Sequence, residues 1–133
     1  MIRMMKSDPF WYSPVWAGPR SVVAMIGADV GSKQALLIEL ANQLGMPDDV
    51  PPSHMTWDDL VAQLSELDWE PVEGADAVVL MHTAMPALPD DVLAVYLDAL
   101  RRAIDGRGNE RPRLVVVFPS AAQSYVSALA RPG

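Results

Sequence analysis

Ala77-Val-Val-Leu-Met81 is a short apolar run with two β-branched residues, and it ends at His82. Such a run is typical of a buried β-strand. Two similar runs, Ser21-Val-Val-Ala-Met-Ile26 and Arg113-Leu-Val-Val-Val-Phe118, lie on either side of it in the chain and end at a glycine and a proline. Three continuous apolar runs separated by helical segments predict parallel strands, because parallel strands need crossover connections and are buried on both faces.

The segments between and after these runs carry apolar residues at helical spacing. Ser32 is the expected N-cap of a helix that ends near Leu44, before Gly45, and Thr56 is the expected N-cap of a second helix. The four expected helices cover residues 33–44, 57–67, 90–104 and 121–130. Gly106 is the expected C-terminal cap of the third helix. The predicted fold is therefore α/β, with a small three-stranded parallel sheet flanked by helices.

The length of 133 residues fits one domain with two short extensions. Residues 1–19 are expected to form an extended arm, because residues 8–19 contain three prolines and four of the nine aromatic residues. The arm has two interpretations: its rings close the edge of the core, or they bind a partner. Residues 20–120 would form the α/β domain, and residues 121–133 a short C-terminal helix or tail.

The composition excludes several classes of site. The chain has no cysteine, so disulfides, thiolate zinc sites and a cysteine nucleophile are ruled out. No apolar stretch approaches the roughly 18 residues of a membrane span, and the apolar run at the N-terminus is too short for a secretory signal. We therefore expect a cytoplasmic protein without a membrane partner.

The acidic residues are concentrated in one part of the chain. The formal net charge is -7, but from Gln34 to Leu100 there is no lysine or arginine. That window contains 13 carboxylates: Glu39, Asp48, Asp49, Asp58, Asp59, Glu66, Asp68, Glu70, Glu73, Asp76, Asp90, Asp91 and Asp98. Such a surface repels nucleic acid and anionic membranes and attracts cations, so the expected partner is a basic protein and not a nucleic acid.

Three motifs resemble catalytic or ligand sites but fail on spacing. Gly27-Ala-Asp-Val-Gly-Ser-Lys33 lies where a phosphate loop would lie, but its glycines are one residue too close and its serine precedes the lysine. Ser53-His54 near Asp58 contains the residue types of a triad, without evidence of triad geometry. His54 and His82 lack the spacing of a metal site. We therefore expect no enzyme activity, no cofactor and no metal.

The stretch Thr56-Trp-Asp-Asp-Leu-Val-Ala-Gln-Leu-Ser-Glu-Leu-Asp-Trp69 resembles the barstar family, the intracellular inhibitors of secreted bacterial ribonucleases. Trp57-Asp-Asp-Leu60 and Leu67-Asp-Trp69 match the family's motifs in residue type and spacing. The preceding helix and the following strand, helix and strand also come in the family's order. The resemblance covers roughly residues 20–120 and implies a barstar-like fold.

The resemblance also implies a function and a set of contact residues. A barstar-like chain would insert a loop and an acidic helix into the active site of a basic ribonuclease or nuclease toxin, as an immunity protein or antitoxin. Asp58 matches the first family aspartate, whereas the family's central carboxylate, four residues later, falls on Ala62. The implied partner-binding set is His54, Met55, Trp57, Asp58, Asp59, Ala62, Glu66 and Asp98.

Two other functional classes remain open. One is a different protein-binding adaptor on the same fold, and the other is an enzyme or small-ligand binder, because a fold alone does not fix a function. An inhibitor should lose its binding to a basic nuclease when Asp58 and Asp59 are both reversed to lysine, whereas an enzyme should lose turnover when His54 or His82 alone is changed. The loss of the central carboxylate at Ala62 points to a target different from the usual ribonuclease.

Overall fold

The computed structural model describes residues 10–12, 19–46, 54–67, 69, 72, 74–108 and 112–130. Outside these residues lie most of the predicted arm, the C-terminal residues 131–133 and five carboxylates of the acidic window, namely Asp48, Asp49, Asp68, Glu70 and Glu73. The elements in chain order are β1 (Ser21–Ile26), α1 (Lys33–Leu44), α2 (Trp57–Glu66), β2 (Ala77–His82), α3 (Asp90–Arg107), β3 (Arg113–Val117), a 3-10 turn (Ser120–Ala122) and α4 (Gln123–Ala130).

The three strands form one parallel sheet in the order β1-β2-β3. Val23 of β1 lies beside Val79 of β2, which lies beside Val115 of β3. This confirms the predicted α/β class with a three-stranded parallel sheet. The strands begin where they were expected, and β2 ends one residue later than the apolar run while β3 ends one residue earlier.

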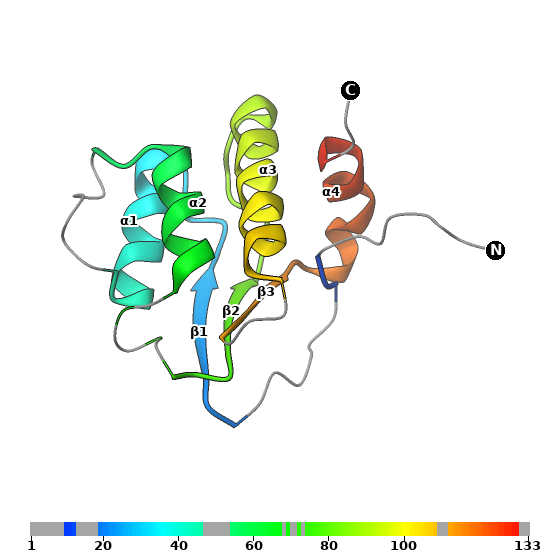
Figure 1. The fold of residues 1–133 in the computed structure, drawn as a ribbon. Coiled ribbons are helices and arrows are strands. Elements are labelled where there is room, and N and C mark those ends of the chain that lie inside the picture. Colours follow the sequence, from blue (N-terminus) through cyan, green and yellow to red (C-terminus); the bar gives the residue numbers. More distant parts are fainter. Residues whose placement is uncertain are drawn as a thin grey trace.

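The helices pack against one face of this sheet. The side chains of Leu80 on β2 and Val116 on β3 share one apolar core with leucines of α1, α2 and α3 and with Val126 of α4. Figure 1 shows α3 between α2 and α4. The N-termini of α1 and α3 follow the carboxyl ends of β1 and β2, so both helices begin at the same edge of the sheet.

The helix ends follow the capping residues in most cases. The Ser32 hydroxyl accepts a hydrogen bond from the Ala35 N–H, and Gly45 ends α1 in the left-handed conformation, as predicted. The predicted end of α3 is wrong, because the helix continues through Gly106 and Arg107 to a cap at Gly108, where φ is +58°. A left-handed backbone suits glycine, and Gly108 therefore ends α3 in place of Gly106.

Phe10, Trp11 and Tyr12 pack along the free edge of β3. The Trp11 N–H donates to the Val116 carbonyl at 2.9 Å, and the Phe118 N–H donates to the Trp11 carbonyl at 2.8 Å. The Phe10 ring is buried and meets the Phe118 ring edge-on at 5.3 Å between centroids. These three residues of the predicted arm therefore close the edge of the core, although Trp11 itself remains half exposed.

The outer face of the sheet is different. Ala77, Val79, Val115 and Val117 form a small separate cluster there, to which none of the described helices contributes. Val23 and Met25 of β1 point to this face and are 47% and 49% exposed. The prediction that β1 is a buried strand is wrong, because β1 lies at the edge of the sheet and the described helices cover only one of its faces.

The outer edge of β1 is bonded by a side chain of α1. The Gln43 amide accepts a hydrogen bond from the Met25 N–H at 2.6 Å and donates one to the Met25 carbonyl at 2.6 Å. The Gln43 side-chain nitrogen also donates to Glu39, one turn earlier in α1. A glutamine thus takes the place that the backbone of a neighbouring strand would fill.

Among the described helices, none has the length and apolar character that a membrane span requires.

Candidate functional site

An exposed row of side chains runs along α2. Asp58, Ala62 and Glu66 are each four residues apart and all three are exposed, which places them on one solvent-facing side of the helix. The opposite side carries Leu60 and Leu64, which are fully buried against the core. The helix therefore presents two carboxylates with a small apolar residue between them.

The N-terminus of α2 is fixed by a reciprocal pair of hydrogen bonds. The Thr56 hydroxyl accepts from the Asp59 N–H at 3.0 Å, and the Asp59 carboxylate accepts from the Thr56 N–H at 3.0 Å. This capping box satisfies two backbone donors that the helix leaves unpaired. Thr56 was predicted as the N-cap, and Asp59, which was predicted as a partner contact, completes the capping box. The carboxylate of Asp59 serves the helix end, and Asp58 next to it remains on the surface.

The C-terminus of α2 is held by a buried arginine of α3. The Arg107 guanidinium donates to the carbonyls of Ser65 at 2.9 Å, Glu66 at 2.8 Å and Pro112 at 3.0 Å, and its residue is only 5% exposed. A positive charge at the carboxyl end of a helix also complements the helix dipole. Sequence reasoning missed Arg107, because its partners lie in the preceding helix and nothing in their spacing marks them.

The two helices approach closely beside this arginine. A Cβ atom added to Gly106 would lie 2.9 Å from the Ser65 hydroxyl oxygen, so a larger residue at this position would require the Ser65 side chain to move. The next residue after α2, Leu67, is buried and has a φ of +44°, which is unusual for a side chain of that size. The capping box thus closes the start of α2, and Arg107 holds the end of α2 against α3.

Arginines of α3 compensate part of the acidic window. Arg102 donates to Asp98 at 3.1 Å and to Asp58 of α2 at 3.3 Å, and Arg101 donates to Asp98 at 2.6 Å. The structure thus brings together Asp58 and Asp98, which are 40 residues apart in the chain, through one shared guanidinium. The two arginines follow Leu100 directly, and their spacing of three and four residues from Asp98 was a signal that sequence reasoning overlooked.

The other predicted contact residues lie around the start of α2. Trp57 is half-buried, with its ring 6.0 Å from the Tyr96 ring and 5.4 Å from the ammonium of Lys33. His54 is exposed, whereas Met55 is only 4% exposed and belongs to the core. The side chain of Met55 therefore packs in the core at the start of α2. Ser53 lies outside the described residues.

His82, the last residue of β2, lies in the core, 2% exposed, against Tyr96 of α3. Its Nδ1 lies 2.9 Å from the Val117 carbonyl, and its Nε2 lies 2.7 Å from the Tyr96 hydroxyl. Because a carbonyl can only accept, Nδ1 must carry the proton, and Nε2 accepts from Tyr96. Burial lowers the pKa of His82 from 6.5 to about 4, and the bond to Val117 opposes this shift. Burial also raises the pKa of Tyr96. Each residue stays neutral near pH 7, which fits a structural pair.

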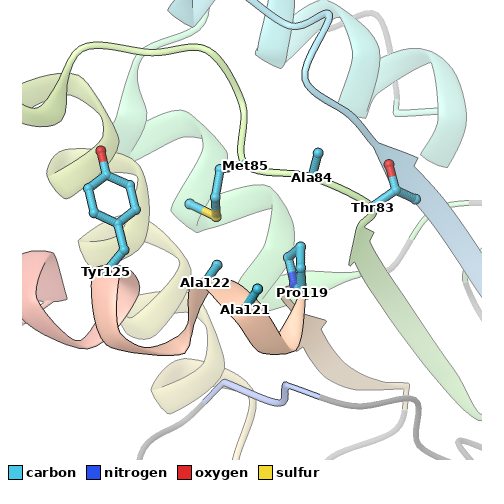
Figure 2. Close-up of a pocket in the computed structure, with 7 residues that line it drawn as sticks. All are labelled: Thr83, Ala84, Met85, Pro119, Ala121, Ala122 and Tyr125. Atoms are coloured by element: carbon cyan, nitrogen blue, oxygen red, sulfur yellow. The ribbon is translucent and has the colours of Figure 1, made fainter.

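An open pocket lies at the carboxyl edge of the sheet, away from α2. Its volume is about 410 Å³, and it is lined by Thr83, Ala84 and Met85 after β2 and by Pro119, Ala121, Ala122 and Tyr125 after β3. Figure 2 shows Thr83 and Tyr125 at its two ends, with Met85 between them. In open parallel sheets, the carboxyl edge is where ligands commonly bind. No residue of this pocket was predicted from the sequence.

In the part of the chain that the structure describes, no three histidine, cysteine, aspartate or glutamate residues gather as they would around a metal ion. Comparison of the chain with protein-family models, with curated proteins and with solved structures gave no match. The resemblance to the barstar family thus rests on the sequence motifs alone and stays a prediction.

Proposed function

We propose that this protein inhibits a basic ribonuclease or nuclease toxin by covering its active site with α2 and the adjacent surface of α3. The protein would act inside the cell that makes the nuclease, as a barstar-like immunity protein or antitoxin. The role assigned to it is binding and not catalysis.

The observation that carries this proposal is the rigid presentation of the Asp58–Ala62–Glu66 row. Both ends of α2 are fixed, by Thr56 at the start and by Arg107 at the end. Carboxylates on a rigid helix can bind the lysine and arginine side chains that hold phosphate in a nuclease site. Little conformational entropy would be lost in ordering them, which favours tight binding.

A partner that binds Asp58 and Asp98 must displace the arginine that already pairs with them. Arg102 neutralises part of the charge of Asp58 and Asp98, so a basic partner must compete with this guanidinium for both carboxylates. The side chain of Asp58 is 86% exposed, and that of Arg102 is 44% exposed, so the pair can open at small cost. The partner would then gain two carboxylates already held at the helix surface.

The test uses the purified chain with a barnase-type ribonuclease, inactivated for binding measurements and active for RNA cleavage assays. Binding should weaken as salt is raised, since exposed charges are screened. The double variant Asp58→Asn/Glu66→Gln should weaken binding at least about tenfold, because each carboxylate contacts a cation of the partner. Reversal of Asp59 is avoided, because its carboxylate belongs to the capping box.

Two further variants sharpen this test. Ala62→Asp introduces a carboxylate at the position of the family's central acidic residue and should tighten binding to the barnase-type enzyme. Asp29→Asn removes an exposed carboxylate on the loop after β1 and should leave binding unchanged. The proposal is contradicted if neither the unaltered chain nor Ala62→Asp binds the barnase-type enzyme and inhibits RNA cleavage, or if the double variant does not weaken binding.

The adaptor alternative is favoured by one observation. Arg101 and Arg102 place two positive charges within the acidic surface, so the face is mixed in charge and could also bind a partner with carboxylates of its own. Binding through α2 that leaves RNA cleavage untouched would support the adaptor. Loss of that binding in an Arg101→Met/Arg102→Met variant would identify the arginines as its contacts.

A further inference from the structure

The pocket at the carboxyl edge has an apolar floor. Five of its seven lining residues are Ala84, Met85, Pro119, Ala121 and Ala122, which carry no polar side-chain group apart from the methionine sulfur. At about 410 Å³ it falls within the size range of small-molecule sites. This floor selects a ligand with an apolar body, because such a body leaves no polar group unpaired there.

The hydroxyl protons of the two polar side chains of the pocket are already donated in hydrogen bonds within the protein. The Thr83 hydroxyl donates to the Ile26 carbonyl at 3.2 Å, and the Tyr125 hydroxyl donates to the Asp90 carboxylate. Each hydroxyl oxygen therefore faces a ligand only as an acceptor. Asp90, at the first turn of α3, does not line the pocket, but its carboxylate lies beside it through the bond to the Tyr125 hydroxyl and adds a negative charge there. The hydrogen bond to Asp90 raises the pKa of Tyr125, so the phenol keeps its proton near pH 7.

From this geometry we propose that the pocket binds a small amphiphilic amine, with its apolar body on the alanine and methionine floor and its ammonium group toward Tyr125 and Asp90. An ammonium group has three donors and no acceptor, which matches the Tyr125 oxygen and the Asp90 carboxylate, since both can only accept. A neutral hydroxyl group offers one donor and no charge, and a carboxylate would meet Asp90 with like charge. The site is separate from the α2 face and does not depend on the proposed inhibitor function.

The experiment compares three ligands of similar shape: 2-phenylethylamine, 2-phenylethanol and 3-phenylpropionate. Binding is followed by NMR shift changes at Ala84, Ala121 and Ala122 in the full chain. The amine is expected to bind with a dissociation constant on the order of 1 mM or below, and the alcohol about tenfold more weakly, for the loss of one charge-assisted hydrogen bond. The propionate should bind more weakly still.

Neighbouring carboxylates provide the matched control. Asp90→Asn should reduce the affinity for the amine about tenfold, to that of the alcohol, because the amine loses its counter-charge. Asp91→Asn, at the next position in the same helical turn, should leave the affinity for the amine unchanged. Ala121→Trp, on an exposed residue, should block the amine and the alcohol alike without disturbing the core.

Three results would overturn the proposal. The first is the absence of shift changes with the amine up to about 10 mM, a concentration that corresponds to negligible affinity. The second is equal binding of the propionate and the amine. The third is an equal loss of amine binding in Asp90→Asn and Asp91→Asn, which would indicate a general attraction to an acidic surface.

Discussion

The polar groups of the interior and those of the α2–α3 surface use similar bonds in different surroundings. In the interior, His82 and Arg107 donate to backbone carbonyls, and their residues are 2% and 5% exposed. On the surface, Arg102 bonds Asp58 and Asp98 at 3.3 Å and 3.1 Å, with every side chain at least 44% exposed. The distances alone would rank the two groups as nearly equal.

Burial makes the difference between them. A surface carboxylate that loses its arginine is solvated at once, so the pair contributes little to the free energy of unfolding. A buried carbonyl or ring nitrogen that loses its partner has no water to replace it, and the cost is that of an unsatisfied group. The interior groups therefore hold the fold, and the surface charges remain free to change partners.

Arg107→Met should give the largest loss of stability. It leaves the carbonyls of Ser65, Glu66 and Pro112 without their donor and frees the end of α2, at a cost of about 3–5 kcal/mol. Urea unfolding followed by circular dichroism measures the loss. Arg113→Met, on an exposed arginine of β3, is the matched control and should change stability by no more than about 0.5 kcal/mol. Equal losses in the two variants would show that Arg107 does not anchor α2.

The second largest effect is the pH dependence due to His82. Its pKa falls from 6.5 in the unfolded chain to about 4 in the folded protein, so the unfolded chain binds the proton more readily. The contribution to stability is fully present above pH 6.5 and is lost as the pH falls from 6.5 toward 4, by roughly 3 kcal/mol. Unfolding free energies at several pH values measure it.

Two histidine variants separate this effect from the titration of carboxylates. His82→Gln should be less stable at pH 7 and should lose most of the slope between pH 6.5 and pH 5. His54→Gln, which changes the exposed histidine, should keep the slope of the unaltered protein. A slope that survives His82→Gln would assign the pH dependence to other groups.

Thr56→Ala should have an intermediate effect, because the capping box lies at the surface but serves backbone donors. Removing the hydroxyl leaves the Asp59 N–H without its acceptor and should cost about 1 kcal/mol. Thermal unfolding compared with that of Thr56→Ser, which keeps a hydroxyl, isolates the hydrogen bond. If Thr56→Ser were as unstable as Thr56→Ala, packing of the threonine methyl group would be responsible and not the cap.

Asp58→Asn should have the smallest effect on stability. It breaks the exposed ion pair with Arg102 and should change the unfolding free energy by less than about 0.5 kcal/mol, at low or high salt. Urea unfolding in both buffers measures the change. A loss above about 1 kcal/mol would mean that the surface pair stabilises α2 as a buried group does, and the distinction between the two regions would fail.

Local signals were sufficient to predict most of the fold. The apolar runs identified the three strands, and Ser32, Gly45 and Thr56 marked helix ends because caps depend on neighbouring residues in the chain. The end of α3 at Gly108 was not predicted. The last turn of α3 contains Arg107, whose hydrogen bonds to α2 depend on tertiary packing and not on neighbouring residues in the chain. The exposure of Val23 was not predicted either, because the position of a strand within the sheet depends on topology and not on its own sequence.

The candidate site was only partly predictable. The exposed row along α2 followed from helical spacing, and Asp58, Ala62 and Glu66 lie together as that spacing requires. The bond between Asp58 and Arg102 joins residues 44 positions apart in the chain, and the pocket joins segments after two different strands. Such contacts arise from the packing of distant segments, which one-dimensional patterns do not encode.

The Gln43 amide has a consequence for how copies of this protein meet. An open strand at the rim of a sheet is a template on which another chain can grow, and the apolar residues Val23 and Met25 make β1 a strong one. Gln43 occupies the N–H and carbonyl of Met25, so an incoming strand must first displace a side chain that makes both bonds at 2.6 Å. One glutamine of α1 thus acts against polymerisation at the outer edge of the three strands that the described residues form.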